Sequence, residues 1–204
     1  MEKKQIVGFT AYKGLMLQQH DNYAEPFTNL ILNTKPKRIL EIGTGTGGLT
    51  LFLREKLNEL GFNDTYFKTY DVNDAYLNSD HYDLTNLEIL KDNLFIGGNE
   101  FILDRYDLIQ PYIQSEGVTI VMCDGGNKIK EFNQIAPLLK SGDIIMAHDY
   151  AHDDETFKNE IYDKIWNWCE IQEKDIIEIC NKENLEDYMK SEFNQIVWAC
   201  KIKK

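Results

Sequence analysis

The residues from 43 to 48 contain the pattern with the most evident chemical use. Gly43, Gly45 and Gly48, with Thr44 between the first two, follow a short apolar run. Glycine permits a tight turn and a close approach of the backbone to a ligand, and a helix that begins there directs its positively polarised N-terminus at that ligand. The spacing fits G-x-G-x-x-G, and with Gly47 it also fits G-x-G-x-G. The loop alone therefore predicts either a dinucleotide or S-adenosylmethionine as the ligand.

Acidic residues near this loop favour S-adenosylmethionine. Glu41 precedes the first glycine by two residues, where a carboxylate suits a sulfonium and an ammonium group and opposes a pyrophosphate. Asp71 ends the next predicted strand, where it can accept hydrogen bonds from both ribose hydroxyls, and Asp74 is the second choice for that role. Asn99 is a candidate for contact with the adenine, with an ordinary turn as the alternative.

Polar side chains also follow two later apolar runs. Asp124 comes after residues 118–123, and His148 and Asp149 come after residues 144–147. Because ligands of open α/β sheets bind outside the carboxyl ends of the strands, these three side chains should meet at the edge that carries the glycine loop. They suit proton abstraction or a divalent cation, and Asp124 also lies within reach of the cofactor. Simple solvation of polar strand ends is the alternative.

An alternation of strands and helices must position these residues. The apolar patterns predict strands at 38–42, 65–71, 94–97, 118–123, 144–147 and 195–203, and helices around 27–31, 49–60, 84–90, 129–139 and 157–165. This order predicts an α/β fold, a Rossmann-like, doubly wound and mostly parallel sheet whose C-terminal strand adds as an antiparallel edge. We expect one domain over 1–204, with an N-terminal helical cap segment (1–36), a cofactor-binding core (37–150) and C-terminal helices with the last strand (151–204).

Composition restricts the partners of the protein. With 204 residues and a formal net charge of −12, the chain is suited to one core and opposes extended contact with nucleic acid. The 4 cysteines form no C-x-x-C pair and are expected to be reduced. No apolar segment is long enough for a membrane span, so we expect a cytoplasmic protein that acts on a small molecule, with homo-oligomerisation left open. Trp166, Trp168 and Trp198 are interpreted as core packing, with a substrate-binding wall as the alternative.

The segment Glu41-Ile42-Gly43-Thr44-Gly45-Thr46-Gly47-Gly48, together with Asp71, resembles motifs I and II of class I S-adenosylmethionine-dependent methyltransferases. More narrowly, the upstream run Gly14-Leu15-Met16-Leu17-Gln18, with Asp21 and Lys35-Pro36, is similar to the cephalosporin hydroxylase and macrocin O-methyltransferase branch. The resemblance implies that Gln18 joins the cofactor-binding residues.

The same resemblance implies a magnesium ion near the acceptor hydroxyl groups, held by an acid after the fourth strand and a pair of residues after the fifth. Asp124 and Asp149 match these positions, but His148 stands where the family usually has a carboxylate. Imidazole prefers softer metals, so His148 argues against a hard cation. The alternatives are a site for Mg²⁺ or another divalent cation, with His148 as a ligand, and a site in which His148 is the general base. The lysine that acts as the base in catechol O-methyltransferase-like enzymes would correspond to Asn127. This chain therefore has such a base only if the neighbouring Lys128 acts as one.

The sequence therefore predicts an S-adenosylmethionine-dependent O-methyltransferase that acts on a small hydroxylated acceptor, such as a sugar or a natural-product intermediate. Two other functions share the glycine loop. One is a nicotinamide-dependent oxidoreductase, which the acid at Glu41 and the lack of an evident Tyr-x-x-x-Lys pair disfavour. The other is a non-catalytic protein that binds S-adenosylmethionine for stability or assembly.

Overall fold

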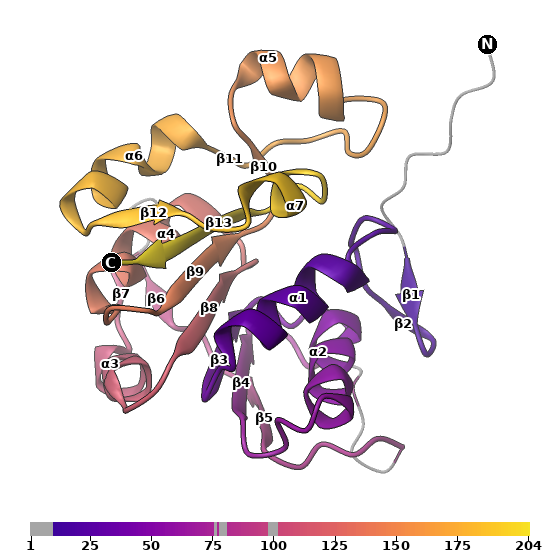
Figure 1. Ribbon diagram of the computed structural model, residues 1–204. Helices are drawn as coiled ribbons and strands as arrows, with labels where there is room; N and C mark the ends of the chain where they lie inside the picture. The colour runs from indigo at the N-terminus through magenta and orange to yellow at the C-terminus, as the bar shows by residue number, and fades with distance from the viewer. Residues whose placement is uncertain (1–9, 76, 78–80, 98–101) are drawn as a thin grey trace.

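A seven-stranded sheet lies at the centre of the fold (Figure 1). The computed structural model describes residues 10–75, 77, 81–97 and 102–204. The strand order is β12-β13-β9-β8-β3-β4-β5. These strands are β3 (Arg38–Ile42), β4 (Tyr66–Asp71), β5 (Leu87–Lys91), β8 (Thr119–Cys123), β9 (Ile144–Ala147), β12 (Leu185–Asp187) and β13 (Ala199–Lys203). The neighbours from β9 to β5 pair in parallel, whereas β13 is antiparallel to β9 and β12 is antiparallel to β13. The predicted parallel sheet with an antiparallel C-terminal edge is confirmed, and that edge comprises two strands.

Helices cover both faces of the sheet and bury two hydrophobic clusters. Side chains of α1 (Ala24–Thr34), α2 (Gly48–Glu59) and α7 (Lys190–Asn194) lie in one cluster. Side chains of α3 (Tyr106–Gln114), α4 (Lys128–Ile135), the 3₁₀ turn η1 (Ala136–Leu138) and α6 (Glu173–Lys182) lie in the other. β3, β8 and β9 are buried along their whole length, as strands covered on both faces should be.

Short elements complete the chain. They are β1 (Ala11–Tyr12), β2 (Leu15–Met16), β6 (Phe95–Ile96), β7 (Ile102–Leu103), β10 (Tyr150–Ala151), α5 (Asp154–Thr156), the π-helical turn η2 (Phe157–Ile161) and β11 (Ile171–Gln172). Among its described residues, the N-terminal segment contains a β1-β2 hairpin before α1. Among the described residues, no helix is long and apolar enough to cross a membrane. All four cysteines are free thiols, as expected.

The prediction of a helix around residues 84–90 is wrong. Residues 87–91 form β5, which pairs in parallel with β4 and is the third strand along the chain. Leu87 packs on the cluster of α1 and α2, and Leu90 packs on the cluster of α3 and α4. Their spacing of three residues resembles one face of a helix, but on a strand the same odd spacing places side chains on opposite faces of the sheet.

The prediction that residues 94–97 form the third strand of the sheet is also wrong. In the described part of the chain, β6 pairs with β7 alone, as a separate two-stranded antiparallel sheet. Three helices have no counterpart in the predicted elements, namely α3, α6 and α7. Residues 195–198 precede β13 and do not extend it, since Val197 has a φ of 57°. The predicted helix with Phe157 and Ile161 is present as α5 and the π-helical turn that follows it.

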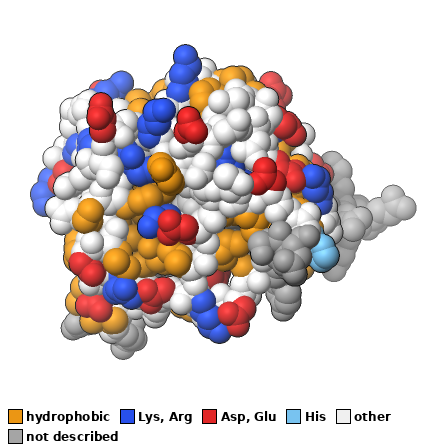
Figure 2. Space-filling model, turned by 90° about the horizontal axis from the view of Figure 1, so that it is seen from below, with side chains coloured by type: hydrophobic (Ala, Val, Ile, Leu, Met, Phe, Trp, Pro, Cys, Tyr) orange, Lys and Arg blue, Asp and Glu red, His pale blue; other side chains and the backbone are white. Residues whose placement is uncertain are grey.

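The surface seen in Figure 2 mixes charges of both signs. Lysine and arginine side chains lie among aspartate and glutamate, with hydrophobic side chains between them. This face shows no continuous basic patch among the described residues, so it offers no broad surface to a polyanion.

Candidate active site

A cleft of about 560 Å³ lies where β3, β4, β8 and β9 end, a volume that suits a small-molecule ligand. It brings together nearly all the residues that the sequence predicted for the site. The predicted residues that line it are Gln18, Glu41, Gly43, Thr44, Gly45, Gly48, Asp71, Asp124, His148 and Asp149. Asn99 lies outside the described residues.

The glycine loop owes its shape to close backbone packing. A β-carbon on Gly43, whose φ is +94°, would lie 2.1 Å from the carbonyl oxygen of Asp124, and one on Gly48 would lie 2.4 Å from that of Met16. A β-carbon on Gly45 would meet no atom within 4 Å, although its φ of +55° is still left-handed. Gly43 and Gly48 thus allow neighbouring segments to close around the loop, whereas Gly45 leaves its side open.

Glu41 lies at the floor of the cleft, and only 1% of its surface is exposed. The hydroxyl groups of Thr50 and Thr69 each donate a 2.6 Å hydrogen bond to its Oε2 atom. Burial raises the pKa of the Glu41 carboxyl to about 8, and the nearby carboxylates of Asp124 and Asp71 act in the same direction. The Glu41 carboxyl is therefore mostly protonated at neutral pH, and a cationic ligand beside it would favour its ionised form.

Asp71 connects its strand to the glycine loop. Its Oδ2 atom accepts a 2.8 Å hydrogen bond from the Gly45 amide, and its Oδ1 atom accepts one of 2.8 Å from the Asn73 amide. Asp74, the alternative for the same role, instead forms an exposed ion pair with Lys91 and does not line the cleft. Of the two acids, Asp71 is the one that lines the cleft.

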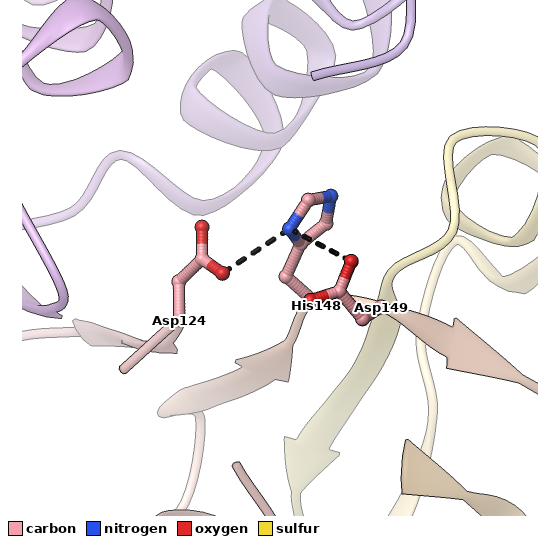
Figure 3. Close-up of side chains that lie close together, drawn as sticks. All are labelled: Asp124, His148 and Asp149. Atoms are coloured by element: carbon pink, nitrogen blue, oxygen red, sulfur yellow. Dashed lines mark hydrogen bonds and ion pairs between the residues drawn. The ribbon is translucent and has the colours of Figure 1, made fainter. Parts of the chain in front are cut away.

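Asp124, His148 and Asp149 converge across the ends of β8 and β9 (Figure 3). The Nδ1 atom of His148 lies 3.1 Å from Oδ1 of Asp124 and 3.6 Å from Oδ1 of Asp149. The backbone supports this arrangement, since the His148 amide donates to the Cys123 carbonyl and Asp149 has a left-handed φ of 56°. A left-handed backbone conformation is uncommon for residues other than glycine, but aspartate adopts it more readily than most because its side chain is short.

His148 is 2% exposed and lies among aromatic rings. The Trp198 ring lies 4.8 Å away between centroids and the Trp166 ring 5.6 Å away. Burial alone would lower the pKa of His148, but the carboxylates of Asp124 and Asp149 outweigh it and raise that pKa above its ordinary value. Its Nε2 atom is buried without a hydrogen-bond partner and points away from Asp124 in Figure 3. Of the two ring nitrogens, Nδ1 is therefore the one that contacts the acidic cluster.

Lys128 lies inside the same cluster and is 6% exposed. Its ammonium group lies 2.9 Å from Oδ2 of Asp149, 2.7 Å from Oε2 of Glu170 and 3.6 Å from Oδ1 of Asp124. The indole Nε1 of Trp168 donates a 2.9 Å hydrogen bond to the other oxygen of Asp149. The three neighbouring carboxylates outweigh burial, which by itself lowers the pKa of Lys128, and raise that pKa so that the group stays charged.

Sequence reasoning missed several residues of this site. Glu170 belongs to a polar stretch without a readable period, and Lys128 entered only as a substitute for a lysine base. Glu131 was also missed. It is buried, and its carboxylate accepts hydrogen bonds from the amides of Gly125 and Asn127, so it holds the loop that follows Asp124. Burial raises the pKa of Glu131 to about 7. The sequence did offer one indication of Glu131: Asn127 is a typical N-cap residue, and an acid in the first turn of the helix that follows is favoured there.

The donor set does not fit a magnesium ion with Lys128 in place. Asp124, His148 and Asp149 offer ligand atoms within 4.8 Å of one another, but one of the three is an imidazole, whereas Mg²⁺ prefers oxygen. An ion between the two carboxylates would also lie close to the Lys128 ammonium. Repulsion between a divalent and a monovalent cation about 4 Å apart is on the order of 8 kcal/mol at an effective dielectric constant of about 20.

Comparison with solved structures shows the fold. An apo structure of CmcI matches with a TM-score of 0.65 and 12% identity over 95% of this chain and 76% of that one. CmcI with magnesium and S-adenosylmethionine gives a TM-score of 0.63 at 13% identity, over the same shares. A Staphylococcus aureus protein assigned as a caffeoyl-CoA O-methyltransferase gives 0.55 at 15% identity, over 89% of this chain and 83% of that one.

Sequence comparison adds no family. No family model matches the chain, and no curated protein matches it. The resemblance to S-adenosylmethionine-dependent methyltransferases that the sequence predicted is confirmed by these structural neighbours at the level of the fold.

Proposed function

We propose that this protein is an S-adenosylmethionine-dependent methyltransferase that methylates an oxygen atom of a small hydroxylated acceptor, such as a sugar or a natural-product-like compound. The observation that carries the proposal is the charge of the cleft. Seven acidic side chains line it, whereas Lys128 is the only lysine or arginine among its described lining residues. Such a lining favours a sulfonium and an ammonium group and opposes the pyrophosphate of a dinucleotide.

The proposed cofactor contacts are the residues of the glycine-loop end of the cleft. They are Gln18, Glu41, Gly43, Thr44, Gly45, Gly48, Asp71 and Asp124, with Asn99 as a further predicted contact. Glu41 supplies a buried carboxylate for a positive group, and Asp71 supplies the acid for the ribose. Gly45 has open space at its side, which allows a ligand to approach the backbone.

Bound S-adenosylmethionine supplies an electrophilic methyl group on a sulfonium. The protein's task is to align the acceptor oxygen and accept its proton as the new O–CH₃ bond forms and the S–CH₃ bond breaks. Asp124 is the proposed proton acceptor, because its side chain is more exposed than those of His148 and Asp149. His148 stabilises that carboxylate through Nδ1, and Asp149, bonded to both Lys128 and Trp168, positions the cluster. The proposal contains no divalent cation, because the Lys128 ammonium competes for the same two carboxylates.

Calorimetry with S-adenosylhomocysteine tests the cofactor assignment. Asp71→Ala removes the ribose-binding acid and should weaken binding by about tenfold to a hundredfold, as expected for charge-assisted hydrogen bonds. Gly45→Arg should abolish binding, because its side chain would fill the open space beside the loop. Asp74→Ala is the matched control, since this exposed acid does not line the cleft. Wild-type affinity in both Asp71→Ala and Gly45→Arg, or tight NADH binding without binding of S-adenosylhomocysteine, would refute the assignment.

Methyl transfer itself is tested with labelled S-adenosylmethionine and a panel of hydroxylated metabolites. We expect label in at least one acceptor, and a loss of transfer in Asp124→Asn that far exceeds any loss of affinity for S-adenosylhomocysteine. Binding of the cofactor with no transfer to any acceptor in the panel would instead favour a non-catalytic role.

A further inference from the structure

The Lys128 side chain fills a position that a cation is expected to hold. Its ammonium donates to Asp149, Glu170 and the Gly125 carbonyl at 2.9, 2.7 and 3.2 Å. An ammonium has three N–H groups, so these partners use all of them. The fourth neighbour is Asp124, at 3.6 Å. Lys128 thus bridges three carboxylates, which come from the segments after β8, after β9 and before β11.

The same carboxylates belong to the cluster that could otherwise ligate a metal. Asp124 and Asp149 supply two of its three candidate ligand atoms. Both oxygens of Asp149 are engaged, one by Lys128 and the other by the Trp168 indole. An incoming divalent ion would have to displace the Lys128 ammonium, which is 6% exposed. The ammonium is attached to the chain beside the site, so it does not lose translational entropy on binding there, whereas a free ion does.

We propose that the Lys128 ammonium takes the place of a divalent cation in this site, so that Asp124 and Asp149 are ordered, and the acceptor is oriented, without a bound metal. The inference rests on the proposed methyl transfer and deepens it. Lys128 is a positioning residue, because its donors are directed at protein oxygens and it acts on the acceptor through the two aspartates.

Titration with Mn²⁺, monitored by the electron paramagnetic resonance signal of the free ion, tests this directly. Wild-type protein should bind no Mn²⁺ up to about 1 mM. Lys128→Met should gain one bound ion, with a dissociation constant at least about tenfold below that limit. Adding Asp124→Asn to Lys128→Met should remove the gain. Lys128→Arg keeps the charge and should behave like the wild type. Should Lys128→Met not fold, Lys128→Gln takes its place with the same expectation.

Lys201→Met is the matched control for the loss of a buried ammonium. Lys201 is 3% exposed and bridges Glu173 and Asp187, neither of which lines the cleft. The Lys201→Met variant should lower the free energy of unfolding without creating a Mn²⁺ site that depends on Asp124. Transfer by the wild type should also be unchanged by EDTA.

Two results would overturn the inference. One is stoichiometric Mn²⁺ binding by the wild type that Asp124→Asn abolishes, and the other is a folded Lys128→Met protein that gains no site. Failure of the proposed function would be visible separately, as absent binding of S-adenosylhomocysteine in calorimetry, and the Mn²⁺ titration would still decide the role of Lys128.

Discussion

The buried carboxyl of Glu41 should make the protein less stable as the pH rises, and Glu41→Gln should remove that dependence. Its pKa is raised from 4.5 to about 8 by burial, with Asp124 and Asp71 adding to the effect. Between these two values the folded state binds more protons than the unfolded state. The unfolding free energy therefore falls as the pH rises through that window and becomes level above it.

The magnitude follows from the same pKa. One pH unit within the window corresponds to about 1.4 kcal/mol, and pH 7 lies roughly two and a half units above the ordinary pKa. The carboxyl should thus destabilise the wild type by about 3 kcal/mol at pH 7 relative to pH 4.5. Glutamine keeps a carbonyl oxygen that can accept from Thr50 and Thr69, so the variant should lose little of the local hydrogen bonding.

Urea unfolding of the wild type and Glu41→Gln at several pH values between about 5 and 8.5 measures the effect. The stability advantage of the variant should grow across the window by about 3 kcal/mol or more. Glu131, whose pKa is also raised, titrates in both proteins and cancels in the difference. The same variant should bind S-adenosylmethionine at least about tenfold more weakly, because it lacks the carboxylate that a cation favours. A stability difference that stays constant with pH would show that Glu41 is ionised throughout, and would refute the reasoning.

Two further predictions concern the loop and the acceptor side of the cleft. Gly43→Ala should destabilise the fold by about 3 kcal/mol or more, because its β-carbon would meet the Asp124 backbone at 2.1 Å, whereas Gly45→Ala should cost only about 1 kcal/mol. Thermal unfolding of both variants measures this, and equal losses would contradict the packing described for Gly43. Trp168→Phe removes the hydrogen bond to Asp149 and should raise the KM for the acceptor by roughly fivefold while the affinity for S-adenosylhomocysteine is kept. An equal loss of cofactor affinity would place Trp168 on the cofactor side instead.

Local patterns in the sequence were sufficient to predict which residues line the glycine-loop end of the cleft. The glycines, the apolar runs of β3, β8 and β9, and the acids that follow strands all depend on backbone conformation and burial within a few residues. Parallel strands bring their carboxyl ends to one edge, so the topology placed Glu41, Asp124 and His148 together as predicted.

The third strand shows where local pattern fails. The spacing of Leu87 and Leu90 is compatible with one face of a helix, and only pairing with β4 shows that the segment is extended. Pairing between strands depends on contacts distant in the sequence, which periodicity does not report.

The sequence by itself determined the α/β class, the glycine loop and the acids that meet at the strand ends, because each is written in neighbouring residues. Only the tertiary structure decided what neutralises those acids. Lys128 from α4 and Glu170 from the segment before β11 meet Asp149 through the relative placement of separate elements, and no spacing along the chain encodes distances of 2.9 and 2.7 Å between such groups.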